Sequence, residues 1–291
     1  MVWPVTTQCR VLDVSASGYH QYRARQRGNR AGLPGHSGRR ICDVALLVHI
    51  KAVFNEMKGA YGWPRIWREL QSRGVRASKE RVRKLMKAHG LCARGKRKFK
   101  ATTNSAHDLP VSPNLLERKF SVGAPDRVWT GDITYLWTEE GWVYLAVVID
   151  LFSRQVVGFA MSERMTRQLV IDALRMAWFR RRPTPGLIFH SDRGSQYASG
   201  DFQKQLSAFG MRGSMSRKGN CWDNAVTETL FGSLKVERLH AMRFASRRQA
   251  KDEVIDWLRF YNRRRLHSTL GYLSPMAFEE KWLGDEKKLA A

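Results

Sequence analysis

Apolar residues recur every three or four positions between residues 41 and 90, in three runs of helical length. In the first run the predicted buried stripe is Val44, Leu47, Val48, Phe54 and Met57. The second run starts at Pro64, and the third starts after Ser78, a favourable N-cap, and ends at Gly90. Three short helices with Gly74 between the last two predict a helix-turn-helix, although the same spacing suits any small helical bundle.

The segments on either side of these helices have much weaker periodicity. Residues 1–40 are rich in Arg and Gly, and we expect one short helix within residues 14–28 followed by a loop. Residues 94–114 begin with a basic run and show no period, as is typical of a linker. The helical domain is therefore bounded on both sides by segments without a predicted core.

Strand-like runs begin after the linker. An apolar stretch at 127–137, a "TEEG" turn and a second apolar stretch at 142–150 predict a hairpin whose second strand is covered on both faces. Strands that alternate with helices further along predict a mixed α/β domain. The remaining expected elements are a strand at 155–161, a helix from Thr166 to about Trp178, a strand at 187–192, a helix at 200–209, a strand at 211–216, a helix after Gly219, an amphipathic helix at about 247–262 and a short helix from Pro275.

The domain boundaries follow from these changes of pattern. The α/β part is the one that can build a catalytic site, because strand ends in such domains gather ligands. We expect a basic N-terminal segment at 1–40, a helix-turn-helix DNA-binding domain at 41–93, a basic linker at 94–120, an α/β catalytic core at 121–240 and a C-terminal helical extension at 241–291.

The net charge points to a class of partner. The chain carries 51 Lys and Arg against 26 Asp and Glu, a net charge of +25 with a pI of about 10.6. The basic residues recur in clumps along the whole chain, which favours a nucleic acid bound over several surfaces above a merely solvated basic surface. Four scattered cysteines without a CxxC pair argue against a zinc site and a disulfide framework, and no apolar run is long enough for a membrane span. We expect a cytoplasmic protein.

The third predicted helix has the surface that a DNA-recognition helix needs. Four cations are predicted to project from it into solvent: Lys79, Arg83, Lys84 and Lys87. Such cations contact phosphates, and their long side chains reach base edges. Arg217 and Lys218, in a loop of the core, suit the same phosphate contacts, although solvated loop charge is an equal alternative.

Two aspartates stand where a buried charge needs an explanation. Asp132 lies within the first strand of the hairpin, and Asp192 ends the strand at 187–192. A single Asp at a strand end usually caps a turn, but the carboxyl ends of strands in open α/β sheets are where ligands bind. If the two strands are neighbours, both carboxylates face one crevice and can hold Mg²⁺, a hard cation, beside a phosphodiester.

The stretch "GNCWDNAVTETLFGSLKVE", residues 219–237, predicts a helix and offers a third carboxylate. Asp223 precedes the helix and suits its N-cap. At about 100° per residue, Glu237 lies roughly 180° from Glu228 and faces outward, whereas Lys235 falls within about 20° of Glu228 and roughly 10 Å along the axis. We therefore select Glu228 as the third acid and Lys235 as a DNA contact on the same face.

Several long motifs resemble one family. The stretches "WTGDITYL", "VIDLFSRQVVG", "HSDRGSQYAS", "CWDNAVTETLFGSLKVE" and "YNRRRLHSTLGYLSPMAF" are similar to segments of the OrfB-type catalytic proteins of insertion sequences. These are DDE transposases, with a core similar to retroviral integrase and ribonuclease H. The resemblance covers nearly the whole chain, including the helix-turn-helix. It implies a ribonuclease H-like, mixed-sheet integrase catalytic core at residues 121–240.

The resemblance also implies the chemistry and the partners. Asp132, Asp192 and Glu228 match the family's catalytic triad, with 35 residues between the last two, and Lys235 matches its downstream basic residue. The triad would hold two Mg²⁺ ions, which Mn²⁺ could replace, and catalyse 3′-end nicking and strand transfer. The implied partners are double-stranded DNA at the element ends and the target, further copies of this chain, and the product of an upstream reading frame as a fusion or partner. The implied location is the bacterial nucleoid.

Four other residues near these acids have structural alternatives. Asp150 suits a turn better than a metal site. His190 either shapes the metal site or is a hydrogen-bonded structural histidine. Gln196 and Tyr197 are expected to contact DNA near the acids.

Two other functions stay open on the sequence alone. The chain could be a DNA-binding regulator or an inactive transposase remnant, which the intact acidic triad argues against. It could also be a structure-selective nuclease that cuts branched DNA whatever its terminal sequence.

Overall fold

The computed structural model of the chain describes residues 4–30, 41–95, 112–116, 121–216, 225–240 and 242–289. It divides into two compact units, Met1–Met57 with Tyr61–Cys92, and Lys58–Ala60 with Ala93–Ala291. No helix in the described ranges is long and apolar enough to cross a lipid bilayer.

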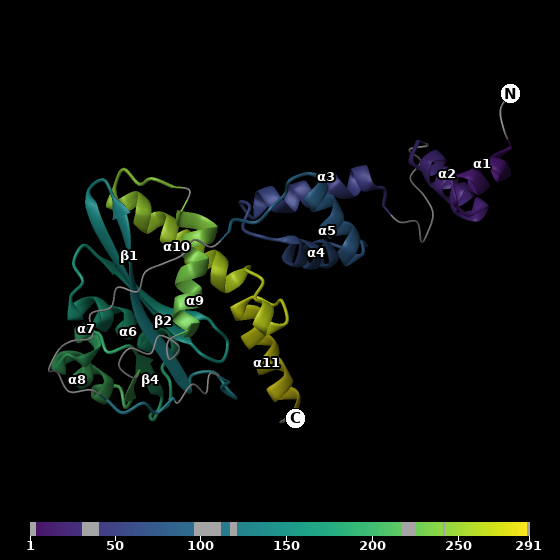
Figure 1. Cartoon of the computed structure of the whole chain (residues 1–291). Helices are drawn as coiled ribbons and strands as arrows, with labels where there is room; N and C mark the ends of the chain where they lie inside the picture. Colours follow the sequence, from purple (N-terminus) through teal and green to yellow (C-terminus); the bar gives the residue numbers. More distant parts are fainter. Residues whose placement is uncertain are drawn as a thin grey trace. The chain divides into compact units, whose positions relative to one another are not determined.

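The first unit is entirely helical (Figure 1). Its elements are α1 (Val5–Val11), α2 (Ala16–Arg30), α3 (Asp43–Glu56), α4 (Trp63–Ser72) and α5 (Lys79–Ala88). The prediction of one short helix before residue 40 was wrong, because two helices form there and α2 has 15 residues. Ala, Arg and Gln sustain a helix by intrinsic propensity even where no apolar stripe marks it.

The predicted buried stripe of α3 was also wrong, although the helix itself is confirmed. Leu46, Ile50 and Val53 are buried, whereas Val44 and Val48 are 76% and 62% exposed. Both sets have helical spacing, so periodicity alone could not choose between two apolar stripes on one helix.

The helices α4 and α5 form as predicted. They bury Ile66, Leu70, Val82 and Met86. The Ser78 hydroxyl accepts a hydrogen bond from the Arg81 N–H at 3.4 Å, which caps α5. Gly74 and Gly90 follow the two helices with φ of +77° and +64°, a conformation that favours glycine.

The second unit is built on a five-stranded mixed sheet with strand order β3-β2-β1-β4-β5. Its strands are β1 (Val128–Thr138), β2 (Gly141–Asp150), β3 (Val156–Ser162), β4 (Ile188–Ser191) and β5 (Arg212–Met215). The first three are antiparallel, and β4 and β5 run parallel to β1 and to each other. The predicted mixed α/β architecture is confirmed.

Helices cover both faces of this sheet (Figure 1). One face packs against α6 (Arg167–Arg181), α7 (Ser195–Ala198) and α8 (Gly200–Ala208), and the other against α9 (Ala225–Leu234) and α10 (Arg247–Arg263). Gly158 permits close packing of α6, because a Cβ there would lie 2.3 Å from the Ala173 carbonyl oxygen. The sequence did not predict α7.

The C-terminal part continues from α9 through a π-helical turn, η2 (Lys235–Leu239), and after α10 through η3 (Ser268–Leu270) and α11 (Pro275–Leu289). The last helix has 15 residues and not the short span predicted. It is anchored on the turn after β2, where the Phe152 ring lies 5.3 Å from the rings of Phe278 and Trp282.

Candidate active site

The register of β1 and β4 brings the two aspartates together. Gly131 pairs with Ser191, and Asp132 and Asp192 are the next residues on these neighbouring parallel strands. Residues that pair on neighbouring parallel strands point to the same face of the sheet. The Asp132 and Asp192 side chains therefore lie on one face, just past the end of β4. Past Gly131 no described strand pairs with this edge of β1. The two carboxyl groups therefore meet at the carboxyl end of β4, beside the open edge of β1, and this place is called the acid crevice.

The surroundings of Asp132 disfavour its charged form. Burial, and then repulsion by Asp192 and Glu228, raise the pKa of Asp132 well above its usual 3.8. A hydrogen bond from the Ile133 N–H to Oδ1 at 2.7 Å and the positive charge of Lys235 oppose this shift only in part. The carboxyl therefore needs a further cation to hold its charge.

A backbone hydrogen bond orients Asp192, and a pair of hydroxyls holds the start of the helix that carries Glu228. The Gly194 N–H donates to Asp192 Oδ1 at 3.0 Å. Glu228 lies in the first turn of α9, next to Thr227, whose hydroxyl is 3.2 Å from that of Thr130 on β1. This buried hydroxyl pair attaches the start of α9 to β1. The Glu228 side chain is largely exposed, and the partial burial of its carboxyl raises its pKa.

Lys235 reaches the same crevice from the end of α9. Its Nζ lies 5.4 Å from the centre of the Tyr135 ring. Partial burial lowers the pKa of Lys235, and the charge of Asp132 acts against that shift. Asp192, Glu228 and Lys235 thus all lie within electrostatic reach of Asp132.

The donor set fits a hard divalent cation, because every candidate ligand is a carboxylate oxygen. Within the described parts of the chain, no three His, Cys, Asp or Glu side chains lie close enough together to hold one metal ion. Binding of a divalent cation at this site would therefore depend on the pair of carboxylates of Asp132 and Asp192, with the carboxylate of Glu228 further from them.

Known proteins are similar to this chain over nearly its whole length. Two integrase core domain models match residues 123–221 and 209–275, and an HTH-like domain model matches residues 42–99. "Transposase InsF for insertion sequence IS3A" of Escherichia coli (strain K12) is 46% identical over 278 residues, which are 95% of this chain and 94% of the relative. The chain belongs to the OrfB-type family of insertion-sequence DDE transposases.

Other relatives are similar over the same length. "Insertion element IS600 uncharacterized 31 kDa protein" of Shigella sonnei is 43% identical over 275 residues, which are 94% of this transposase and 98% of that protein. Among solved structures, the HTLV-2 integrase catalytic core domain in complex with magnesium (trimeric form) is similar with a TM-score of 0.44 and 17% identity, over 54% of this chain and 97% of that one.

One acid of this transposase was placed wrongly from its helical angle. Glu237 does not face outward, because it is buried in η2 and paired with the buried Arg265, whose Nη2 lies 2.5 Å from Oε1. Arg265 also donates to the Ser233 hydroxyl at 3.1 Å, and Arg94 donates to the Glu237 carbonyl at 3.0 Å. The segment after α10 that carries Arg265 therefore covers the face of α9 that lies opposite Glu228. Both faces of this helix thus carry residues with a role, one in packing and one beside the acids.

Asp150 and His190 are structural. Asp150 is fully buried and accepts hydrogen bonds from the N–H groups of Asp126, Phe152 and Ser153, as the turn role predicted. His190 is fully buried between the strands, and its ring nitrogens lie 2.9 Å and 3.3 Å from the hydroxyls of Ser214 and Ser216.

Tyr197 was expected to contact DNA, and that expectation was wrong. Its ring is buried against Phe189 and Phe202, and its hydroxyl lies close beneath Gly131. Burial and the charges of Asp132 and Asp192 raise its pKa, so it stays protonated next to the acids. One sign in the sequence indicated that Tyr197 packs next to the acids, namely an aromatic residue soon after Asp192 at the end of a strand.

Three sequence-predicted residues, Arg217, Lys218 and Asp223, lie outside the described residues. Gln196 donates from Nε2 to the Met165 carbonyl at 3.3 Å, which ties α7 to the loop before α6.

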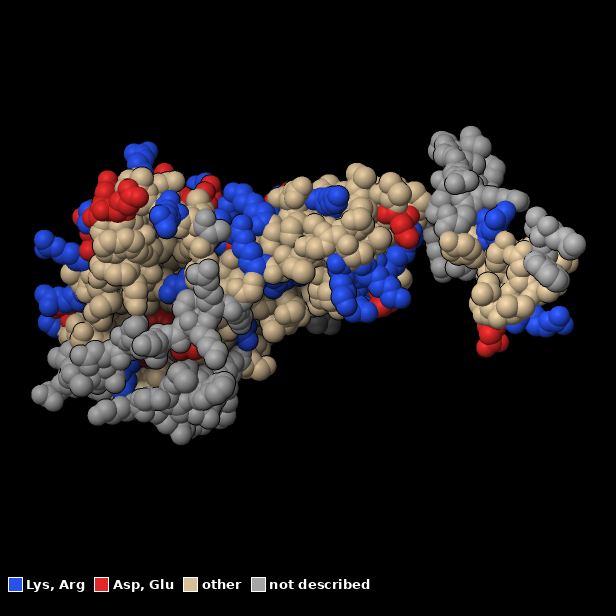
Figure 2. Space-filling view, turned by 45° about the horizontal axis from the view of Figure 1, so that its top comes forward, with Lys and Arg blue, Asp and Glu red and all other residues tan. Residues whose placement is uncertain are grey.

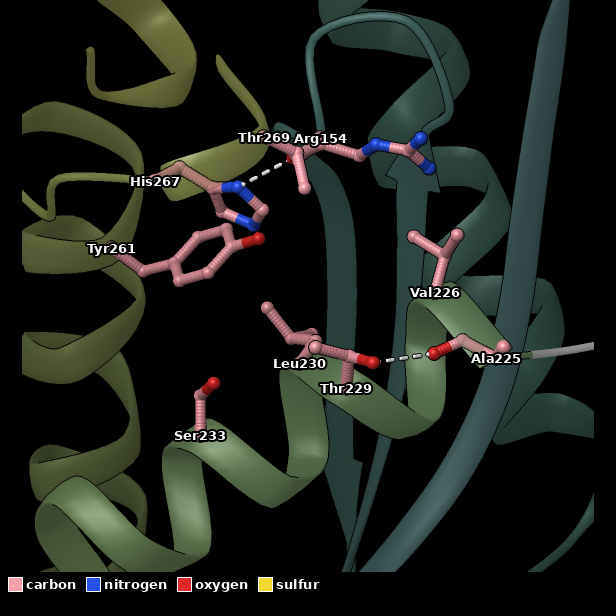
Figure 3. Close-up of a pocket in the computed structure, with 9 residues that line it drawn as sticks. All are labelled: Arg154, Ala225, Val226, Thr229, Leu230, Ser233, Tyr261, His267 and Thr269. Carbon is pink, nitrogen blue, oxygen red and sulfur yellow. Dashed lines mark hydrogen bonds between the residues drawn. The ribbon is translucent and has the colours of Figure 1, made fainter. Parts of the chain in front are cut away.

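A pocket of about 250 Å³ lies on the side of α9 that faces away from Glu228 (Figure 3). It is lined by Arg154, Ala225, Val226, Thr229, Leu230, Ser233, Tyr261, His267 and Thr269. None of the active-site carboxylates borders it, so it is separate from the acid crevice.

The helix-turn-helix presents the predicted basic surface. Lys79, Arg83, Lys84 and Lys87 are exposed on α5. Arg83 is paired with Glu80 at 2.6 Å, and the Lys79 Nζ lies 4.8 Å from the Trp67 ring centre. Figure 2 shows Lys and Arg side chains gathered on one side of this three-helix part.

Proposed function

We propose that this transposase nicks the 3′ ends of its element and joins them to target DNA in a divalent-metal-dependent reaction. The observation that carries the proposal is the juxtaposition of Asp132 and Asp192 at the end of β4, with Glu228 and Lys235 in electrostatic reach. A basic protein that gathers its carboxylates at one crevice is suited to phosphoryl transfer on a polyanion.

Asp132, Asp192 and Glu228 are the proposed ligands of two Mg²⁺ ions, for which Mn²⁺ is the proposed substitute. When bound, such ions activate the attacking oxygen and stabilise the leaving oxygen of an in-line displacement. The raised pKa of Asp132 supports this assignment, because a divalent ion would offset the burial and the repulsion that disfavour the charged carboxylate.

The chain's own residues bind and orient the DNA. Lys235 is positioned to pair with a phosphate beside the scissile bond, and its contact with Tyr135 limits its freedom. Arg217 and Lys218, which precede α9 in the sequence, are proposed phosphate contacts. Tyr197 supports the floor of the crevice through its packing under Gly131.

The helix-turn-helix is the proposed element-end binder, with Lys79, Arg83, Lys84 and Lys87 on phosphates and base edges. We further propose that several copies act together on the DNA, and that an upstream reading-frame product assists end recognition as a fusion or partner. The exposure of α5 and the match to the HTH-like domain model support the proposal that the helix-turn-helix binds the element ends.

The test uses DNA with the terminal sequences that flank this reading frame, incubated with Mg²⁺ and the full chain, with and without the upstream product. Wild type is expected to nick at the element ends and join them to a target plasmid, whereas Asp192→Asn binds the DNA without cutting. Cutting of branched DNA regardless of terminal sequence would identify a structure-selective nuclease. Binding without any reaction, even with the upstream product, would identify an inactive regulator.

A further inference from the structure

The tip of the β1–β2 hairpin carries four aromatic side chains on one face. Tyr135 is paired with Tyr144, and Trp137 with Trp142, in the strand register. The ring centres lie 5.1 Å apart for Tyr135 and Trp142 and 4.8 Å apart for Trp137 and Trp142. Directly paired residues point to the same side, so the four rings form one continuous surface.

The outer end of this aromatic face is open to solvent, its inner residues Tyr135 and Tyr144 are half-buried, and the opposite face of the hairpin is covered. Trp137 and Trp142 are 59% and 42% exposed. On the other side of the same hairpin, Leu136 and Leu145 pack against Ala250 and its neighbours on α10. Pairing with β3 reaches Tyr144 but not Trp142, so the outer end of the aromatic face extends beyond the strand β3.

Stabilisation of the hairpin alone does not account for this exposure. Cross-strand aromatic pairs do stabilise hairpins, but this hairpin already has the packing of Leu136 and Leu145 on its covered face. Large exposed apolar groups that lie together usually mark a binding surface.

The aromatic face can be reached from the acids around an open strand edge. Tyr135 follows Asp132 by three residues, about 10 Å along β1, so its ring and the Asp132 carboxyl point to opposite faces of the strand. Past Gly131 no described strand pairs with this edge of β1, and Lys235 lies at it, since its Nζ is 5.4 Å from the Tyr135 ring centre while its charge acts on Asp132. A DNA strand whose phosphodiester lies at the carboxylates and that passes around this edge would therefore have its next nucleotides beside these rings.

The charges near the tip set the path of that strand. Glu140 accepts a hydrogen bond from the Arg247 N–H at 2.8 Å, and the Arg247 guanidinium lies 3.0 Å from Glu163. These acids stand at the far end of the aromatic face, whereas Lys235 stands at the near end. Phosphates are therefore favoured at the Lys235 end, with bases against the rings.

We propose that Tyr135, Trp137, Trp142 and Tyr144 form a stacking surface for unpaired bases of the DNA strand at the active site. The ligand is unpaired DNA, because bases in a duplex have both faces covered by their neighbours, whereas an unpaired base can stack on an aromatic ring. The proposal rests on the proposed function, since it takes the acid crevice as the place where a DNA strand binds.

The test measures the affinity of the full chain for two DNA probes without Mg²⁺, by fluorescence anisotropy. One probe is a blunt duplex of mixed sequence, and the other is the same duplex with a short unpaired thymidine tail at its 3′ end. Wild type is expected to prefer the tailed probe. Trp137→Ala and Trp142→Ala are each expected to reduce that preference about tenfold, whereas Trp137→Phe keeps most of it. Phe179→Ala, at a comparably exposed aromatic on α6, is the matched control and leaves it unchanged.

An unchanged preference for the tail in both alanine variants would overturn the proposal. If the same variants also self-associate more weakly by sedimentation, the aromatic face is instead a contact between copies of this chain. The Asp192→Asn variant separates this test from that of the proposed function. If it loses cutting but keeps the preference for the tail, the acids serve the reaction and not the binding of the tail. If an aromatic variant loses the preference for the tail while cutting continues, the aromatic face serves binding and not the reaction.

Discussion

At the scale of single residues, the proposed active site is a small group of acids in which Asp192 and Glu228 repel Asp132. Asp132 and Asp192 are adjacent because of strand register, and burial adds to their repulsion. The sequence was sufficient to find both, since charge inside an apolar strand is unusual. It could not reveal the burial of Tyr197 or Glu237, because their partners lie far away in sequence: Phe189 for one and Arg265 for the other.

The raised pKa of Asp132 gives a stability prediction. The folded state binds the proton of the Asp132 carboxyl more tightly than the unfolded state does. Without metal, the free energy of unfolding therefore falls as the pH rises above 3.8. The fall ends once the pH has passed the raised pKa of the folded state. Asp132→Asn removes this cost and is expected to melt at a higher temperature than wild type at neutral pH in a chelator.

The same measurement with Mg²⁺ supplies the control. Added Mg²⁺ is expected to raise the melting temperature of wild type but not of Asp132→Asn, because the ion binds the folded, deprotonated site. Equal responses of the two proteins to Mg²⁺ would argue against Asp132 as a ligand.

At the scale of elements, α9 is held on two faces, and both matter for the site. Thr227 contacts β1 on one side, and Glu237 pairs with Arg265 on the other. Helix and strand positions were largely predictable, because their apolar periods are clear. The stripe of α3, the short α7 and the length of α11 were not, since each depends on which surface a neighbouring element covers.

Breaking the buried pair between Glu237 of η2 and Arg265 is expected to be costly. Glu237→Gln leaves Arg265 buried without a matching charge, and should lower the free energy of unfolding by about 3 kcal/mol in chemical denaturation. Asp252→Asn is the matched control, because its partner Arg248 lies 3.9 Å away on an exposed surface and such pairs contribute about 0.5 kcal/mol or less. A loss as small as that of the control would show that the pair does not hold α9 in place.

At the scale of the whole molecule, the charge of +25 governs how DNA is bound. Affinity is expected to fall steeply with salt, in proportion to the number of phosphates contacted. Composition alone predicted this, whereas the residues that make the contacts depend on the fold.

The helix α5 can be tested within this salt dependence. Lys87→Ala is expected to weaken binding to any duplex and to lower the slope of log affinity against log salt by about one. The matched control is Lys288→Ala, an exposed lysine at the end of α11, which should leave the slope unchanged. Equal slopes for wild type and Lys87→Ala would exclude Lys87 from the DNA contacts.

The central claim is that three carboxylates act as one metal site, and Glu228 is its most exposed member. The most direct measurement is the rate of Mg²⁺-dependent nicking at an element end by Glu228→Gln, at saturating DNA and with binding checked separately. We predict a rate at least about a hundredfold below that of wild type, with DNA affinity retained. Nicking at the wild-type rate would contradict the assignment of Glu228 and with it the three-carboxylate site.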